Sequence, residues 1–191
     1  MSESGSQAGP RARRSELALA FCIVVAVGLT FLSVDYPRSV PGAGLAAIAL
    51  IIARADWRAR IIPNPASLAA AALALAEALI SEQPQAAAID ALTRGAALFL
   101  LFLGFRSTFR FWRGREGMGL GDVKLAGVLG LWLDWSYIPV AIELACVSAI
   151  AYVIVGRIVF GTAVSGLTKL PFGAFFAPAI WATWMCENLS L

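Results

Sequence analysis

Two aspartates stand in polar stretches that interrupt an otherwise apolar chain. Asp122 lies within REGMGLGDVKLAG at residues 115–127, and Asp56 opens DWRARIIPN at residues 56–64. Two carboxyl groups at close range cannot both ionise cheaply, so they can share a proton, one acting as general base and the other as general acid. Such a pair can activate a water molecule and protonate a leaving amine, as in aspartic proteases.

The rest of the composition limits which catalytic groups and metal sites the chain can form. The chain has no histidine, which excludes Ser-His and Cys-His nucleophiles. Its three cysteines, Cys22, Cys146 and Cys186, lack metal-ligand spacing. A site built from carboxylates alone is unlike the usual zinc sites, and two oxygen donors are too few to coordinate calcium. We therefore expect no metal and no cofactor.

The residues around both aspartates favour a functional site. The ordinary alternative is that each aspartate is a solvated acidic residue at a helix end. Gly119 and Gly121 precede Asp122, and glycine allows close approach of another chain or a positive φ. Pro63 and Asn64 follow the other aspartate. Proline interrupts a helix, and asparagine in this position is expected to cap the helix that follows.

The elements that position these residues are predicted to be membrane helices. The chain is 60% hydrophobic and 14% charged, and its net charge of +3 is too small to argue for nucleic acid as a partner. Lipid excludes open strands, so each long apolar segment is predicted to be helical. We expect an all-α polytopic membrane protein with about seven transmembrane helices, at roughly 17–34, 39–55, 65–81, 88–105, 119–133, 137–160 and 170–187.

The distribution of arginine and lysine predicts the orientation. Basic residues precede the first segment and occupy the connections between the second and third, the fourth and fifth, and the sixth and seventh. Such connections face the cytoplasm. The N-terminus is therefore predicted to be cytoplasmic and the C-terminus periplasmic. Both aspartates then lie at the cytoplasmic boundary of the membrane.

Three blocks carry a resemblance to a known family. DWRARIIPN at 56–64 resembles the D-(x)-R-(x)-IPN signature of the type IV prepilin peptidases, which are GxGD aspartic peptidases. GLGDVKLAGVLGLWL at 119–133 resembles their GxGD-VKL block, and LPFGAFFAPA at 170–179 resembles their late Pro-Phe-Gly segment. The resemblance covers residues 38–187, as a six-helix peptidase core. Residues 1–16 are expected to be a disordered cytoplasmic tail, and 17–34 an extra transmembrane helix.

The resemblance implies an aspartic endopeptidase with Asp56 and Asp122 as the catalytic pair. It would remove the short basic leader from prepilins or pseudopilins at the cytoplasmic face of a bacterial inner membrane. It also allows contact with pilus assembly machinery. Larger members carry an insert with paired CxxC motifs and an N-methyltransferase activity, whereas this chain resembles the short form that serves Flp/Tad-type pili. The residues implied to support the site are Pro63, Asn64, Gly119, Gly121, Lys124, Pro171 and Gly173.

Two other functions compete with this one. A presenilin-type intramembrane protease also uses GxGD, but pairs it with a tyrosine-aspartate motif and a Pro-Ala-Leu motif, whereas this chain has Trp57 after Asp56 and LPFG at 170–173. A small proton-coupled transporter would place its carboxylates at the bilayer midplane and show an internal repeat. No repeat is visible in the sequence.

Overall fold

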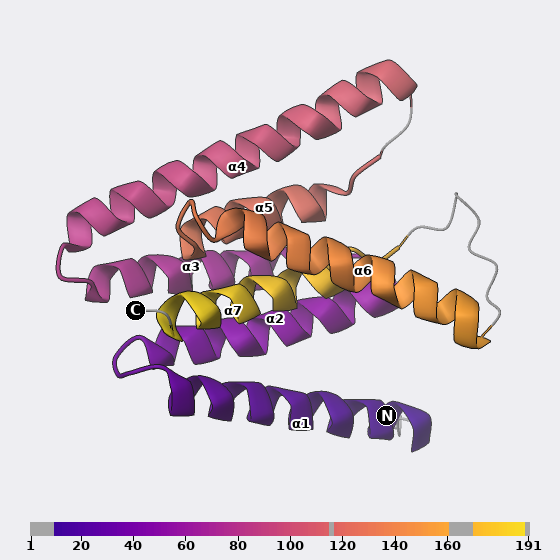
Figure 1. The fold of residues 1–191 in the computed structure, drawn as a ribbon, viewed down its shortest axis with the longest axis horizontal. Coiled ribbons are helices and arrows are strands. Elements are labelled where there is room, and N and C mark those ends of the chain that lie inside the picture. The colour runs from indigo at the N-terminus through magenta and orange to yellow at the C-terminus, as the bar shows by residue number, and fades with distance from the viewer. Residues whose placement is uncertain (1–9, 115–116, 161–169, 190–191) are drawn as a thin grey trace, which may run out of the picture.

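The computed structural model describes residues 10–114, 117–160 and 170–189, without the side chains of 10–14 and 160. Within these ranges every regular element is a helix, so the predicted all-α class is confirmed (Figure 1). The helices are α1 Pro10–Ser33, α2 Ser39–Ala59, α3 Asn64–Ile80, α4 Pro84–Arg113, α5 Leu120–Trp132, α6 Ile138–Phe160 and α7 Gly173–Leu189.

Four of the described helices are long and apolar enough to cross a membrane. They are α1 from Ser15 onward, α2, α4 and α6, and α3 is a shorter apolar helix. A crossing of a core ~30 Å thick needs about 20 residues, and each of these four approaches or exceeds that length. The chain is therefore a polytopic membrane protein, as predicted. Helix α1 begins at Pro10, earlier than the expected start at residue 17, and residues 1–9 lie outside the described ranges.

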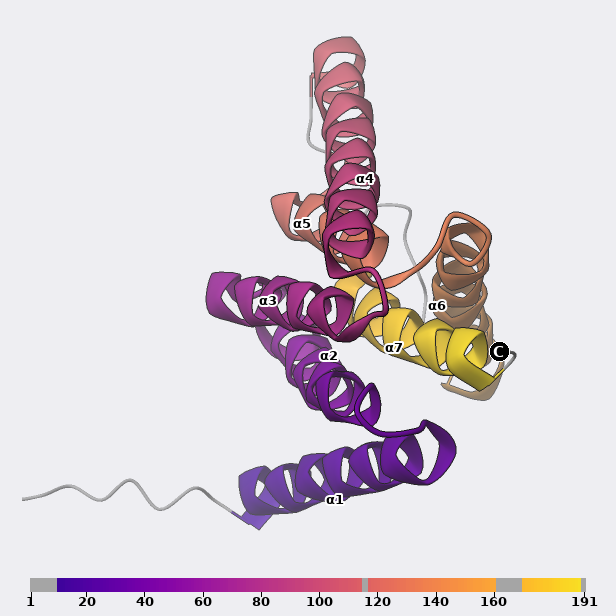
Figure 2. The same cartoon turned by 90° about the vertical axis from the view of Figure 1, so that its left-hand side faces the viewer.

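The core of the bundle lies between α2, α5 and α7. Helix α7 packs along α2, and α5 packs against α3, α4 and α7. Figure 2 shows α1 and α6 at the margins, where α1 rests on α2 and α6 on α7. Large apolar side chains fill the centre and are almost completely buried: Ile52, Leu125, Leu129, Phe176, Ile180 and Trp184.

The first helix is attached to α2 by polar contacts as well as by packing. Arg54 of α2 forms an ion pair with Glu16 of α1 and donates to the Ser15 carbonyl. Arg58, one turn later, donates to the Ser15 hydroxyl oxygen at 2.7 Å. The helix that lies outside the predicted peptidase core is thus fixed to the end of α2 that carries Asp56.

Helices α4 and α5 approach each other closely at a glycine. A Cβ built on Gly130 would lie 2.6 Å from the carbonyl carbon and oxygen of Arg94. The Arg94 guanidinium also donates to the Gly130 carbonyl, with an Nε–O distance of 3.2 Å. The backbones of the two helices therefore meet without room for a side chain.

We expect Gly130→Ala to destabilise the protein by ~1–3 kcal/mol, because the added methyl group overpacks against backbone that cannot rotate away. Gly127→Ala is the matched control on the same helix, since its Cβ would find its nearest neighbour, Phe99 Cβ, at an ordinary 3.4 Å. The apparent melting temperature of each purified variant in detergent measures the difference. Equal melting temperatures for the two variants would show that this contact does not fix the separation of α4 and α5.

Candidate active site

The C-terminal end of α2, which carries Asp56, and the N-terminal end of α5, which carries Asp122, lie at the same end of the bundle, on the right in Figure 1. The C-terminus of α2 meets the N-termini of α3, α5 and α7 there. Asp56 lies in the last turn of α2 and Asp122 in the first turn of α5. Each carboxyl group is therefore carried by a helix end, as the sequence predicted from the ends of the apolar segments.

The carboxylate of Asp56 sits at the N-terminus of α7. Its Oδ2 accepts a hydrogen bond from the Ala174 N–H, with an N–O distance of 3.0 Å, and the Gly173 N–H donates to the same group. The first N–H groups of a helix have no intrahelical acceptor, and the helix dipole favours negative charge beside them. Asp56 is 6% exposed, so these donors replace the water that its carboxylate has lost.

Asp122 is held by its own helix. Gly119 is the N-cap of α5, which makes Asp122 the third residue of the helix, and its carboxyl group accepts from the Gly119 backbone N–H. This is the returning half of a capping box and explains the Gly-x-Gly-Asp spacing. Arg106 of α4 donates to the Met118 carbonyl at 3.1 Å and so holds the turn that leads into α5.

The two carboxyl groups are close enough to interact electrostatically. They come from helices α2 and α5, and the residues between these helices in the sequence form α3 and α4. The structure thus brings together the two aspartates that the sequence selected, and it adds the N-terminus of α7 to them. Their mutual repulsion disfavours the state in which both carboxyl groups are ionised.

The glycines at this end are required for close packing. A Cβ on Gly173 would lie 2.7 Å from Ile62 Cδ1 and 3.1 Å from Asp56 Oδ2, and a Cβ on Gly121 would lie 2.8 Å from the same Ile62 atom. Among the described glycines the positive φ is at Gly114, at 63°, so conformational freedom is not what Gly121 and Gly173 supply. Ile62 was not among the site residues predicted from the sequence, although its place within the IPN block was a signal.

The expectation that Asn64 caps the third helix is wrong. Helix α3 begins at Asn64 itself, and the residue in the cap position is Pro63, which makes no side-chain cap hydrogen bond. Asn64 Oδ1 instead accepts from Lys124 Nζ, which ties the first turn of α3 to the first turns of α5. Lys124 therefore joins two of the family blocks. Pro171 contributes its carbonyl, which accepts from the Ala174 N–H at 3.2 Å.

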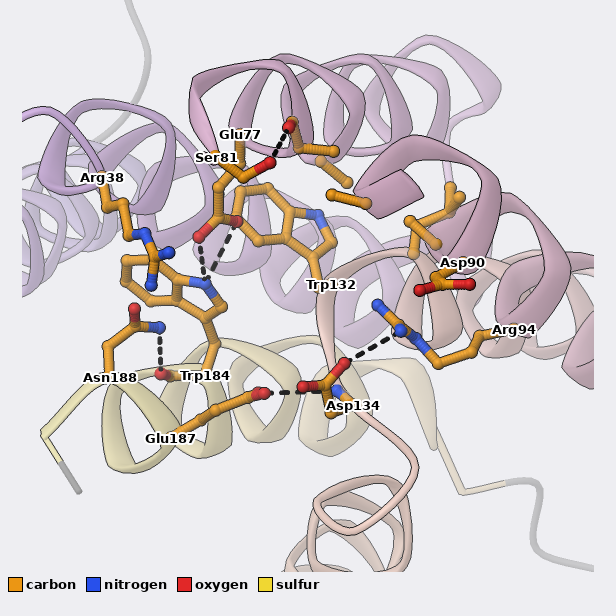
Figure 3. Close-up of a pocket in the computed structure, with 15 residues that line it drawn as sticks. Arg38, Glu77, Ser81, Asp90, Arg94, Trp132, Asp134, Trp184, Glu187 and Asn188 are labelled. Atoms are coloured by element: carbon orange, nitrogen blue, oxygen red, sulfur yellow. Dashed lines mark hydrogen bonds and ion pairs between the residues drawn. The ribbon is translucent and has the colours of Figure 1, made fainter. Parts of the chain in front are cut away.

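A second polar cluster occupies the opposite end of the bundle (Figure 3). It lines a cavity of about 310 Å³. Trp184 Nε1 donates to Glu77 at 3.0 Å, and Arg94 pairs with Asp134 at 2.9 Å. Glu187 accepts from the Asp134 backbone N–H at 3.3 Å. These contacts link α3, α4 and α7 to the turn after α5. The cluster was not predicted from the sequence.

Comparison with protein families decides the classification of the chain. Residues 43–154, which include Asp56 and Asp122, match the model of the type IV leader peptidase family. The chain belongs to the type IV leader peptidase family. This membership favours the leader peptidase hypothesis over the presenilin-type and transporter hypotheses.

Curated relatives of this leader peptidase family member come from several bacteria. It is 41% identical over 71 residues to the leader peptidase HopD of Escherichia coli, covering 37% of this chain and 45% of the relative. It is 42% identical over 92 residues to a prepilin leader peptidase/N-methyltransferase of Pseudomonas aeruginosa, covering 44% of this chain and 31% of the relative.

A longer match extends through most of the family member. It is 32% identical over 145 residues to a prepilin leader peptidase/N-methyltransferase of Burkholderia pseudomallei, covering 73% of this chain and 44% of the relative. The chain thus spans less than half the length of these curated relatives. No solved structure matches it.

Proposed function

We propose that this protein is a prepilin leader peptidase that cleaves the short basic leader from type IV prepilin-like substrates of the Flp/Tad class. The observation that carries the proposal is the site itself. Two carboxyl groups from the family blocks lie at one end of the bundle and interact electrostatically, and each accepts hydrogen bonds from helix N-terminal N–H groups. The relatives of known name are leader peptidases.

The two aspartates take different roles in the proposed reaction. We assign the general base to Asp56, because the N–H groups of Gly173 and Ala174 stabilise its negative charge. The general acid is Asp122, since burial and the neighbouring negative charge of Asp56 both disfavour its ionised form. Asp56 accepts a proton from water as the water oxygen attacks the scissile carbonyl carbon, and Asp122 gives its proton to the leaving amine nitrogen as the C–N bond breaks.

The proposed substrate class follows from the family and from the cysteines. The larger relatives are named as peptidases and N-methyltransferases. The three cysteines of this chain form no CxxC pair, so we restrict the proposal to peptidase activity and to the short, Flp/Tad-type form. The partners are a prepilin or pseudopilin, the lipid bilayer and, during pilus biogenesis, the assembly machinery.

The proposed location is the bacterial inner membrane, with the aspartates facing the cytoplasm. The support is the distribution of basic residues: Arg54, Arg58 and Arg60 lie at the aspartate-bearing end of α2, and Arg106, Arg110 and Arg113 at the neighbouring end of α4. The opposite end carries mainly acidic residues in its connections, including Asp35, Glu82 and Asp134. A leader that remains in the cytoplasm would reach the site from this side.

Co-expression with candidate prepilins from the same genome tests the proposal. Each prepilin is expressed with the wild-type peptidase, without it, and with the Asp56→Asn/Asp122→Asn double variant, and leader loss is scored as a shift on a gel. A shift that requires the two aspartates supports the proposal. Absence of a shift with every prepilin, while the peptidase accumulates in the membrane, would count against it.

Chelators are expected to leave the activity unchanged. The proposed water activation uses two carboxylates, and among the described residues no group of three or more His, Cys, Asp or Glu side chains is placed to hold a metal ion. Leader cleavage by the purified protein is measured with and without an excess of EDTA, followed by addition of Mg²⁺, Ca²⁺ or Zn²⁺. Loss of activity that one of these ions restores would replace the two-carboxylate mechanism with a metal-assisted one.

A further inference from the structure

Ile62 occupies the space between the two aspartate-bearing parts of the site. Helix α2 ends at Ala59, and Arg60 follows in the left-handed conformation with φ 53°, which turns the chain back toward the bundle. Ile62 is 8% exposed and belongs to the apolar core. Its neighbour Ile61 is 64% exposed, so only one of the two consecutive isoleucines enters the bundle.

The side chain of Ile62 contacts both helix N-termini that hold the carboxyl groups. A Cβ atom added to Gly121 would lie 2.8 Å from Ile62 Cδ1, and one added to Gly173 would lie 2.7 Å from the same atom. Gly121 immediately precedes Asp122 on α5, and Gly173 donates to Asp56 from the N-terminus of α7. One methyl group is therefore packed against the backbone next to each aspartate.

We propose that Ile62 is a positioning residue that sets the separation of the Asp56 and Asp122 carboxyl groups. This inference rests on the proposed peptidase function for its kinetic part. The side chain fills the gap between the first turns of α5 and α7, and glycines at 121 and 173 let both turns rest directly on it. Close-packed interiors transmit such a volume change to their neighbours. A smaller residue lets the two turns move. Asp122 then moves with the first turn of α5, and the Asp56 carboxylate is displaced through the hydrogen bonds that it accepts from Gly173 and Ala174 of α7.

The kinetic test compares two neighbouring isoleucines. We expect Ile62→Val, which removes only Cδ1, to lower kcat about tenfold, and Ile62→Ala to lower it about a hundredfold, because small misplacements of catalytic groups have effects of this size. KM should change far less than kcat, since leader binding is not affected. Ile61→Val is the matched control and should match the wild type. Rates are normalised to the amount of monodisperse folded protein, so loss of folded protein alone does not lower kcat.

A rescue experiment separates positioning from a general loss of packing. Gly173→Ala places a methyl group 2.7 Å from Ile62 Cδ1, and once Cδ1 is absent the nearest remaining atoms are at 3.1 and 3.2 Å. Ile62→Val should therefore restore part of the activity of Gly173→Ala, since the 3.1 Å approach of the new methyl group to Asp56 Oδ2 remains. For Gly121→Ala the contacts at 3.0 Å with Ile62 Cβ and Cγ1 remain, so the same change should restore less. Additive losses in both double variants would overturn the inference.

Cross-linking tests the separation without relying on activity. Cys22, Cys146 and Cys186 are exposed and are replaced by serine, and Asp56→Cys and Asp122→Cys supply the only thiols. Bifunctional methanethiosulfonates of increasing length then report the distance between the two positions. We expect Ile62→Ala to shift the best reagent to a shorter length, because the first turn of α5, which carries position 122, closes into the vacated volume toward the end of α2, which carries position 56. An unchanged optimum would overturn the inference even if the protein cleaves prepilins, and a shift would support it even if the substrate proves to be different.

Discussion

Replacing Asp122 by asparagine abolishes cleavage of a prepilin leader, with an expected loss of about a thousandfold or more in kcat. Asparagine has nearly the same shape and can still accept from the Gly119 N–H that holds the aspartate. It cannot deliver a proton to the leaving amine. Asp56→Asn is expected to have an effect of the same size, because the amide cannot take a proton from water. The initial rate of leader release by purified variants in detergent measures both.

The control for this pair is another aspartate changed in the same way. Asp35 lies exposed in the connection between α1 and α2, at the end of the bundle opposite the site. Asp35→Asn should cleave at the wild-type rate. Retention of full activity by Asp56→Asn or by Asp122→Asn would remove that residue from the mechanism, and equal losses in all three variants would point to damage of the fold.

The second large effect is expected from Gly121→Ala, which should lower kcat about a hundredfold through displacement of the adjacent catalytic group. The new methyl group would lie 2.8 Å from Ile62 Cδ1 and 3.0 Å from its Cβ, and a buried side chain held between two helices has little room to yield. The first turn of α5 must then move, and Asp122 moves with it. The measurement is kcat and KM for leader release.

Two other glycines serve as comparisons for Gly121→Ala. Gly104→Ala on α4 would meet no atom within 4 Å and should have no effect. Gly117→Ala would meet the Phe109 ring at 2.4 Å, but that side chain is 38% exposed and can rotate, so the loss should be smaller. A wild-type rate for Gly121→Ala would show that the close contact with Ile62 does not position Asp122.

The helices could be predicted from the sequence because lipid leaves few alternatives. Apolar runs bounded by arginine, proline and glycine predicted the membrane segments, and the helices within the described residues follow those segments to within several residues at most ends. The extension of α4 to Arg113 was missed, since its last turns carry Arg106, Arg110 and Arg113 and no longer read as apolar. The arginines of these last turns favour a helix, although the segment is no longer apolar.

The aspartates could be selected from the sequence, but the way in which they are held could not. Asp122 and Gly119 are only three residues apart, so the hydrogen bond from the Gly119 N–H to the Asp122 carboxyl group could be expected from their spacing. The partner of Asp56 is Ala174, which is 118 positions away and becomes a neighbour only when α7 packs along α2. Asn64 was assigned to a local cap because the sequence did not show Lys124 within reach of its side chain. Tertiary contacts decided both outcomes.

Product analysis with a single purified prepilin shows whether Asp56 and Asp122 act together on one peptide bond. Mass spectrometry of the products is combined with initial rates for the wild type, each asparagine variant and the double variant. We expect one cut by the wild type and no detectable cut by either single variant or by the double variant, because the two groups work as a unit. Cleavage at the same bond by either single variant at a rate near that of the wild type would contradict it.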